Sequence, residues 1–309
     1  MRRDTTLGST LRKEEVLVES LPYIQRYEGK VFVIKYGGAA MADKELNVTF
    51  AKDVTMLKKI GIRIVIVHGG GKDITTLAER LGIETEFRGG QRYTDDRMLD
   101  VVLMVLAGKI NTDIVRRINA NGGGAIGLSG ADNLLLRGCR LSTNGTDLGL
   151  VGTITAVNAP MLELFLNNDL MPVIAPVAVG PSYELLNVNA DLAAAAIAQV
   201  LRAEKLVYLS DVQGVLAGEE LISTLTRSQA ERMVAEGVIA GGMIPKMQSA
   251  FETLEAGVRK VHIVDGRVKH SLLLEVFTDE GIGTQMIPEE GSPSVGEQPA
   301  ASTMAAQTA

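Results

Sequence analysis

Apolar runs rich in β-branched residues alternate with helix-period segments along most of the chain. The apolar runs lie near residues 31–35, 62–67, 125–128, 171–177, 205–210 and 260–264. The helical patterns lie near 43–60, 72–81, 95–120, 159–168, 190–202, 228–236, 246–257 and 270–277. Strands that are apolar throughout and separated by helices are typical of a mostly parallel sheet covered by helices on both faces. We therefore predict an α/β fold of this kind.

Composition narrows the class of protein. The 309 residues suffice for one large α/β domain or two lobes, and 46 % of them are hydrophobic. A net charge of −6 without clustered Lys and Arg argues against a nucleic-acid partner. The single cysteine, Cys139, excludes an intramolecular disulfide, and three scattered histidines give no zinc spacing. Without an apolar signal core or a membrane-length apolar stretch, we expect a cytoplasmic protein with no membrane partner.

Two of the apolar runs stop at glycines. The first ends in Lys35-Tyr36-Gly37-Gly38 and the second in His68-Gly69-Gly70-Gly71. Glycine lets backbone N–H groups approach an anion without an intervening Cβ atom. Neither end has the Gly-x-x-x-x-Gly-Lys-Ser/Thr pattern or a full Gly-x-Gly-x-x-Gly. We therefore predict two anion sites that serve a less common phosphate chemistry.

Two lysines stand where a cation is locally unfavourable. Pro245 is expected at the first helical position, which places Lys246 in the first turn, where a cation costs roughly 0.3–1 kcal/mol. Lys35 ends a buried strand at the same sheet edge as the glycines. Either lysine could instead extend to solvent, but together with the glycines they favour a functional site. Lys72 begins a helix in the same way and is a further candidate.

Polar residues of two other segments are candidates for ligand binding. In Asn187-Val188-Asn189-Ala190-Asp191 the two asparagines share a face if the backbone is extended, and Asp191 falls in the first helical turn. Asn189 could simply cap that helix, but capping does not account for Asn187. Arg92 reads as a loop arginine, which is usually solvated, although its planar fork also suits a carboxylate.

The segment 95–120 is predicted to be one helix, with Thr94 as its N-cap and Gly122 as its stop. Its apolar positions are Leu99, Val102, Leu103 and Leu106, with Val101, Met104 and Val105 outside that stripe. Either a second subunit covers the extra positions or the helix lies deep inside one subunit. Between 132 and 158, short polar-apolar alternation indicates hairpins that form a lid or extend the sheet.

Taken together, the motifs resemble the amino-acid kinase family over roughly residues 10–287. The matching segments are Lys35–Gly38, His68–Gly71, Gln91–Thr94, Asn187–Asp191, Ser210–Gly214 and Gly242–Lys246. The resemblance implies a three-layer αβα sandwich with a mostly parallel central sheet. It also implies an N-terminal helix (1–27), a lobe for the amino acid and a lid (28–185), and a lobe for ATP (186–288). Residues 289–309, rich in Pro, Ser, Gly, Gln and Ala, are predicted to be a disordered tail.

Within that family, the resemblance points to members that use ATP to phosphorylate the γ-carboxylate of N-acetyl-L-glutamate in arginine biosynthesis. It implies three groups of site residues. The catalytic group is Lys35, Lys246 and Asp191. The substrate group is Gly70, Gly71, Arg92, Asn187 and Asn189. The nucleotide group is Gly37, Gly38, Asp211, Gly214, Gly242 and Met243.

The proposed acceptor needs no general base, because a carboxylate with an unperturbed pKa of about 4.3 is already ionised at neutral pH. Mg²⁺ is expected to arrive with ATP rather than in a protein-built site. Two alternatives stay open: another amino-acid kinase, such as one for aminoadipate, or a non-catalytic arginine sensor. Lys72, Gln91 and Tyr93 depart from the residues usual in the family.

Arginine-inhibited members of the family carry an extra N-terminal helix that joins dimers into hexamers. The amphipathic segment 10–27, which contains Pro22, matches that helix, and the stretches Lys260–Arg267 and Glu275–Thr284 match their C-terminal region. The resemblance implies inhibition by arginine, with Tyr23, Glu275, Gly281 and Gly283 at the effector. It also implies a homo-oligomer, a dimer or a hexamer, and leaves room for a nitrogen-signalling partner protein.

Overall fold

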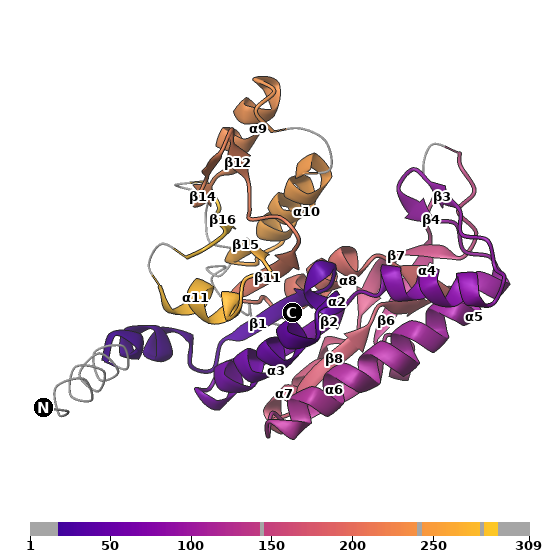
Figure 1. Cartoon of the computed structure of the whole chain (residues 1–309), viewed down its shortest axis with the longest axis horizontal. Helices are drawn as coiled ribbons and strands as arrows, with labels where there is room; N and C mark the ends of the chain where they lie inside the picture. Colours follow the sequence, from indigo (N-terminus) through magenta and orange to yellow (C-terminus); the bar gives the residue numbers. More distant parts are fainter. Residues whose placement is uncertain (1–17, 143–144, 240–242, 279–280, 290–309) are drawn as a thin grey trace, which may run out of the picture.

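A central sheet of eight strands organises the molecule (Figure 1). The computed structural model describes residues 18–142, 145–239, 243–278 and 281–289. The strands, in spatial order, are β14 (Thr224–Leu225), β16 (Thr284–Met286), β15 (Lys260–Asp265), β11 (Lys205–Ser210), β1 (Val31–Tyr36), β2 (Arg63–His68), β8 (Met171–Ala175) and β5 (Ala125–Ser129). All neighbours run parallel except β15 and β16. The predicted mostly parallel sheet is confirmed, whereas the short β14 and β16 were not predicted.

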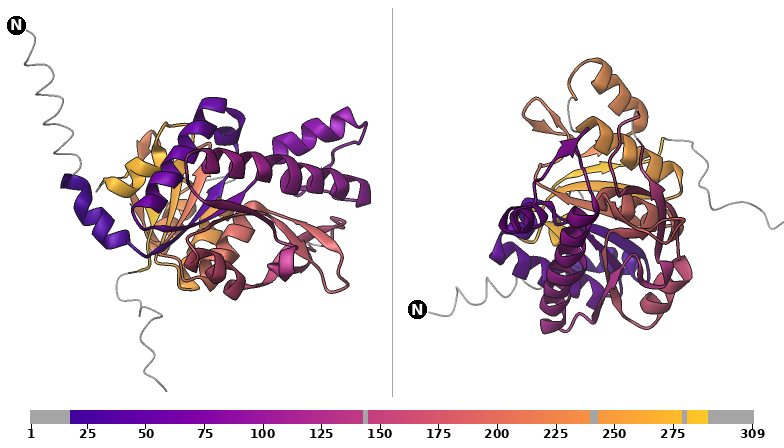
Figure 2. Two further views of the ribbon diagram at one scale, coloured as in Figure 1. Left: turned by 90° about the horizontal axis from the view of Figure 1, so that it is seen from below. Right: turned by 90° about the vertical axis from the view of Figure 1, so that its right-hand side faces the viewer.

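Helices cover both faces of this sheet (Figure 2). One layer consists of α3 (Lys44–Lys59), α6 (Asn111–Ala120) and α11 (Ser271–Phe277). The other consists of α7 (Ala159–Asn167), α8 (Ala190–Val200) and α10 (Met243–Glu255). Each layer closes a separate hydrophobic core over one face. The three-layer αβα sandwich is therefore confirmed.

Strand alternation decides which face each residue of β1 serves. Phe32, Ile34 and Tyr36 are buried in the core beneath α3 and α6, and Val33 is buried in the core beneath α8. Successive side chains of a strand point to opposite faces, so Lys35 shares the face of Val33. The ammonium of Lys35 is thus directed toward the layer that contains α8.

The hairpins predicted between 132 and 158 are part of a small closed barrel. Its strands are β10 (Leu185–Val188), β7 (Val151–Val157), β6 (Leu136–Arg140) and β9 (Val177–Val179). The predicted strand 171–177 was wrong as a single unit: it divides at Pro176 into β8 of the sheet and β9 of the barrel. Pro176 has no N–H to continue a ladder, and its carbonyl accepts from the Val188 N–H instead. A lid role for the barrel stays a prediction.

The predicted helix 95–120 is continuous but not uniform. It comprises α5 (Asp96–Leu103), a π-helical segment η1 (Met104–Ile110) and α6. The N-cap is Asp95, which accepts from the Met98 N–H, so the prediction of Thr94 was wrong. Val101 and Val105 are buried within this one chain, and Met104 is 57 % exposed. The burial of the two valines therefore requires no second subunit.

Several smaller elements complete the described chain. They are α2 (Ala39–Ala42), α4 (Gly71–Arg80), α9 (Arg227–Ala235) and the hairpins β3 (Phe87–Arg88)/β4 (Gln91–Arg92) and β12 (Leu216–Ala217)/β13 (Glu220–Leu221). A helix over 18–27 runs through Pro22, and residues 1–17 lie outside the described ranges. Of the predicted tail only Glu289 is described, and its carboxylate accepts from the Ser228 N–H. Among the described helices, none has the length and apolar character to cross a bilayer.

Candidate active site

The two glycine-rich strand ends lie side by side. Because β1 and β2 pair in parallel with Tyr36 opposite His68, the glycines that follow emerge at one sheet edge. The Gly69 N–H donates to the Tyr36 carbonyl at 2.8 Å, which joins the two ends. A Cβ atom on Gly37 would lie 3.1 Å from Lys35 Nζ, so the lysine passes close over this backbone. The predicted common edge is therefore present.

Lys35 and Asp191 form an ion pair at this edge. Lys35 Nζ lies 2.9 Å from Asp191 Oδ1, and both side chains are mostly buried. Asp191 is the second residue of α8, whose N-cap Asn189 accepts from the Asp191 N–H at 2.7 Å. The buried Oδ1 has no hydrogen bond of favourable angle in the described chain, so Lys35 is its partner through charge. The structure thus joins two of the three predicted catalytic residues.

Lys246 lies on α10, which packs against α8, the helix that carries Asp191. Helix α10 begins at Met243, so Pro245 is its third residue rather than its first, and Lys246 still falls in the first turn. Lys246 Nζ donates to Ser210 Oγ at 3.0 Å. Burial lowers the pKa of Lys246, the Asp191 carboxylate opposes that change, and the Lys35 ammonium reinforces it. The charges of Lys35 and Lys246 therefore both act on the Asp191 carboxylate, whose Oδ1 atom is buried.

Three of the predicted nucleotide residues, Asp211, Gly214 and Met243, lie in the loop after β11 or at the start of α10, the helix that carries Lys246. Asp211 directly follows β11, and its charge acts on Lys246. Gly214 has φ +152°, and a Cβ atom there would lie 2.5 Å from Thr284 Oγ1, so the loop after β11 packs tightly on β16. Met243 starts α10, whereas Gly242 lies outside the described residues. Nucleotide binding by these residues stays a prediction.

Arg92 differs from the solvated loop arginine that its neighbours suggested. It belongs to β4, is 8 % exposed, and stacks over the Phe87 ring at 4.9 Å. Its guanidinium donates to the Gly71 carbonyl at 2.9 Å and to Thr75 Oγ1 at 2.8 Å. Burial lowers the pKa of Arg92. The arginine therefore anchors the first turn of α4, beside Gly70 and Gly71. The turn residues that flank it in the sequence had suggested an exposed loop position instead.

Thr94 joins Arg92 to the predicted substrate residue Asn187. Thr94 Oγ1 donates to the Arg92 carbonyl at 2.9 Å and accepts from Asn187 Nδ2 at 3.1 Å. Sequence reasoning assigned Thr94 to helix capping and missed this contact; its place in the Gln91–Thr94 motif was the available signal. Asn189 caps α8, as the capping interpretation expected. Lys72, the further candidate lysine, is exposed on α4.

Three of the predicted effector residues form a second cluster. Glu275 is 6 % exposed and accepts from the N–H groups of Ile282 at 2.9 Å and Gly283 at 3.2 Å. Gly281 has φ +64°, and a Cβ atom there would lie 2.8 Å from Glu275 Oε2. Tyr23 of the N-terminal helix packs edge-on against Phe277 of α11, with ring centroids 6.3 Å apart. The structure therefore brings the N-terminal helix to the helix that carries Glu275.

Sequence reasoning missed two buried polar residues beside Glu275. His262 Nδ1 lies 2.5 Å from Glu275 Oε1, and burial lowers the pKa of His262 to about 4. Lys205 lies over the Tyr27 ring at 4.8 Å, and burial lowers its pKa to about 8. His262 interrupts an apolar strand run and Lys205 begins one, and these polar residues in apolar strands were the available signal.

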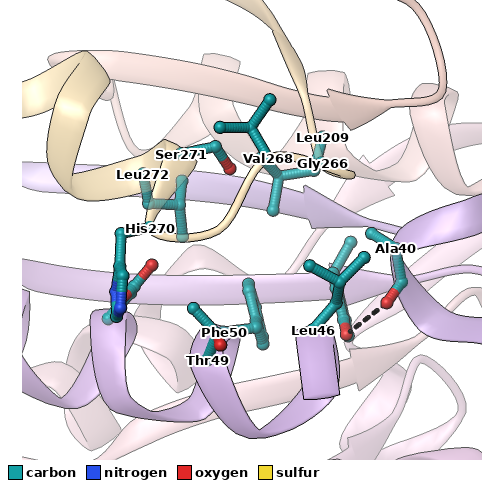
Figure 3. Close-up of a pocket in the computed structure, with 12 residues that line it drawn as sticks. Ala40, Leu46, Thr49, Phe50, Leu209, Gly266, Val268, His270, Ser271 and Leu272 are labelled. Carbon is teal, nitrogen blue, oxygen red and sulfur yellow. Dashed lines mark hydrogen bonds and ion pairs between the residues drawn. The ribbon is translucent and has the colours of Figure 1, made fainter. Parts of the chain in front are cut away.

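A small pocket lies apart from the Lys35–Asp191 pair, between α3 and the β15–α11 connection (Figure 3). Its lining includes Asp53 and His270, whose Oδ1 and Nδ1 atoms are 2.7 Å apart. The cavity volume of about 10 Å³ suits one water molecule rather than a nucleotide. The described part of the chain contains no cluster of three His, Cys, Asp or Glu residues suited to a metal ion.

Known proteins are similar to this chain in sequence and in fold. Residues 30–265 match the amino acid kinase family. Acetylglutamate kinase of Chlorobaculum tepidum is 52 % identical over 276 residues, which covers 89 % of this chain and 96 % of the relative.

Two solved structures are similar as well. N-acetylglutamate synthase of Neisseria gonorrhoeae, complexed with coenzyme A and N-acetyl-glutamate, is 26 % identical with a TM-score of 0.80. The alignment covers 88 % of this chain and 63 % of the synthase. The same synthase complexed with coenzyme A and L-arginine is 27 % identical with a TM-score of 0.75, over 88 % of this chain and 65 % of that one. From the sequence match, the chain belongs to the amino acid kinase family and, within it, to the acetylglutamate kinases.

Proposed function

We propose that the protein transfers the γ-phosphoryl group of ATP to the γ-carboxylate of N-acetyl-L-glutamate. The observation that carries this proposal is the Lys35–Asp191 ion pair beside two glycine-rich strand ends, with Lys246 close enough for its charge to act on both residues. The identity with an acetylglutamate kinase over most of both chains supports the choice of acceptor.

Positive charge and positioning account for catalysis in this site. Phosphoryl transfer passes through a loose transition state whose charge lies on the equatorial oxygens. We assign Lys35 and Lys246 to those oxygens, because they lie on different elements, β1 and α10. Asp191 orients both ammonium groups. The N–H groups of Gly37, Gly38, Gly70 and Gly71 add donors without charge.

The two substrates approach from opposite sides in this proposal. Arg92, Asn187 and Asn189 bind N-acetylglutamate, and Asp211, Gly214, Gly242 and Met243 border the nucleotide. ATP enters with its Mg²⁺ held mainly by phosphate and water oxygens. The acceptor carboxylate is ionised at neutral pH, so no residue has to remove a proton.

The product distinguishes this reaction from simple ATP hydrolysis. An acyl phosphate reacts with hydroxylamine to give a hydroxamate, whereas inorganic phosphate does not. We expect hydroxamate only when ATP and N-acetylglutamate are both present, and a loss of orders of magnitude in Lys246→Ala. Full turnover in Lys246→Ala would contradict the catalytic assignment.

Arginine is the proposed feedback inhibitor. A buried carboxylate such as Glu275, next to the turn at Gly281 and Gly283, suits a guanidinium or ammonium group. Tyr23 on the N-terminal helix would close the site by its contact with Phe277. The likeness to a synthase complexed with L-arginine supports this choice of effector.

Deletion of residues 1–26 tests whether the N-terminal helix is needed for inhibition by arginine. Catalysis should persist while inhibition by arginine disappears; retained inhibition would contradict the assignment.

We further propose a cytoplasmic homo-oligomer, a dimer or a hexamer joined by the N-terminal helices, with a surface for a nitrogen-signalling protein. Sedimentation of the full chain and of the deletion tests the oligomer: a hexamer should fall to dimers.

A further inference from the structure

A buried histidine lies directly beneath one glycine-rich strand end. His68 is the last residue of β2 and is fully buried. Its Nδ1 atom lies 3.0 Å from the carbonyl oxygen of Gly69, and its Nε2 atom lies 3.2 Å from Asn111 Nδ2. The reaction outlined above gives this ring no chemical task. Its two contacts instead connect the glycine turn to the helix that crosses the sheet.

The Asn111 amide determines which ring nitrogen carries the proton. Asn111 Nδ2 also lies 2.9 Å from the carbonyl oxygen of Val173. That carbonyl can only accept, so the amide nitrogen has to face it, and the same NH₂ group donates to His68 Nε2. Burial lowers the pKa of His68 to about 4, which keeps the ring neutral at neutral pH. Nε2 is therefore the acceptor, and Nδ1–H donates to the Gly69 carbonyl.

Fixing the Gly69 carbonyl also fixes the next N–H. In a planar trans peptide, the C=O of Gly69 and the N–H of Gly70 point in opposite directions. The Gly69 N–H already donates to the Tyr36 carbonyl oxygen. Within the described residues, the Gly70 N–H has no hydrogen-bond acceptor. When Nδ1–H holds the Gly69 carbonyl, the Gly70 N–H is turned away from His68. A free peptide at a glycine pair would otherwise rotate easily.

The same helix contacts Gly70 from a second direction. Asn111 directly follows the π-helical segment η1, and π-helical turns often occur at functional sites. A Cβ atom on Gly70 would lie 2.6 Å from both Leu106 Cδ2 and Ile110 Cδ1 of that segment. One face of η1 and α6 thus packs on Gly70 and also supplies the amide that sets the ring of His68.

We propose that His68 and Asn111 are positioning residues that aim the Gly70 N–H at the anionic group of the substrates. This inference rests on the proposed function, because it takes the glycine end to be part of the phosphoryl-transfer site. Neither side chain is assigned a contact with substrate.

Two substitutions of the histidine separate positioning from packing. In His68→Asn, the amide nitrogen occupies the place of Nδ1 and still donates to the Gly69 carbonyl. In His68→Gln, the amide reaches the place of Nε2 and keeps the Asn111 contact, but the donor to Gly69 is lost. Both remove the ring, so the thermal unfolding midpoint of each variant controls for the cavity. Steady-state kcat/KM for N-acetylglutamate is measured for wild type and both variants.

We expect His68→Gln to lose roughly tenfold to a hundredfold in kcat/KM and His68→Asn to stay within about threefold of wild type. Equal losses in both variants, or no loss in His68→Gln, would overturn the inference. Wild-type turnover of N-acetylglutamate is the control for the proposed function. If wild type is inactive, the proposed function is wrong. If wild type is active but the two variants do not differ in kcat/KM, only the positioning role is overturned.

A spectroscopic test needs no stable variant. Nitrogen-15 NMR of histidine-labelled wild type resolves protonated from unprotonated ring nitrogens, and the chain has only three histidines. At neutral pH His68 should show a protonated Nδ1 and an unprotonated Nε2. The opposite tautomer, or a doubly protonated ring, would contradict the donor to Gly69.

Discussion

Lys35 Nζ and Asp191 Oδ1 are 2.9 Å apart although the residues come from a strand and a helix far apart in sequence. Lys35 shares the face of β1 that is covered by α8, and Asp191 lies in the first turn of α8 just after its N-cap Asn189. Each position follows from local structure. The pair exists because the parallel sheet brings both to one edge, where the charge of Lys246 also acts on the carboxylate.

Asp191→Asn tests the orienting role of this carboxylate. The amide has the same shape but leaves two ammonium groups without their shared counter-charge, so we expect kcat to fall by about 10²- to 10³-fold. Asp169→Asn is a matched control, because it removes the carboxylate of another lysine pair, Lys58–Asp169, whose carboxylate is 85 % exposed. That variant should keep wild-type kcat. Similar kcat values for the two variants would contradict the assignment.

The pH dependence of kcat tests the charge on Lys246. Burial lowers the pKa of this lysine from its ordinary 10.5. In the proposed mechanism its protonated form is the active one. As pH rises through the lowered pKa, the charge is lost and kcat falls, so the alkaline limb should lie below pH 10.5. In Lys246→Arg the guanidinium stays charged, so the limb should shift upward although the overall rate is lower. Superimposable alkaline limbs would show that another group is responsible.

Gly70→Ala and Gly71→Ala are neighbouring substitutions with different predicted costs. A Cβ atom on Gly70 would overlap Leu106 and Ile110, whereas one on Gly71 meets no atom within 4 Å. We expect Gly70→Ala to reduce the free energy of unfolding by about 1–3 kcal/mol through overpacking. Gly71→Ala should leave it unchanged or raise it by up to about 1 kcal/mol. Chemical denaturation gives both values, and equal destabilisation would contradict the packing of η1 on Gly70.

The sheet and its covering helices were predictable because β-branched runs and helical periodicity are local signals. The points where an apolar run divides between two sheets, and the shortest strands, were not predictable from local signals. Pro176 divides one apolar run between the sheet and the barrel, and only the barrel closure shows where β9 pairs. The strands β14 and β16 have two and three residues, too few for a periodic pattern, and exist through pairing with the sheet edge.

The candidate site was predictable where residues broke a local rule. Lys35 and Lys246 stand out in a buried strand and at a helix N-terminus. Thr94 was missed because capping explained it equally well, and Arg92 appeared solvated because its partners in α4 lie elsewhere in the sequence. The role of His68 depends on Asn111, and only the fold brings these two residues together.

A single steady-state assay tests the choice of acceptor. ATP consumption is measured with N-acetylglutamate, glutamate, aspartate and aminoadipate under the same conditions. We expect efficient turnover with N-acetylglutamate alone. A kcat/KM for any of the other three that equals or exceeds the value for N-acetylglutamate would contradict it.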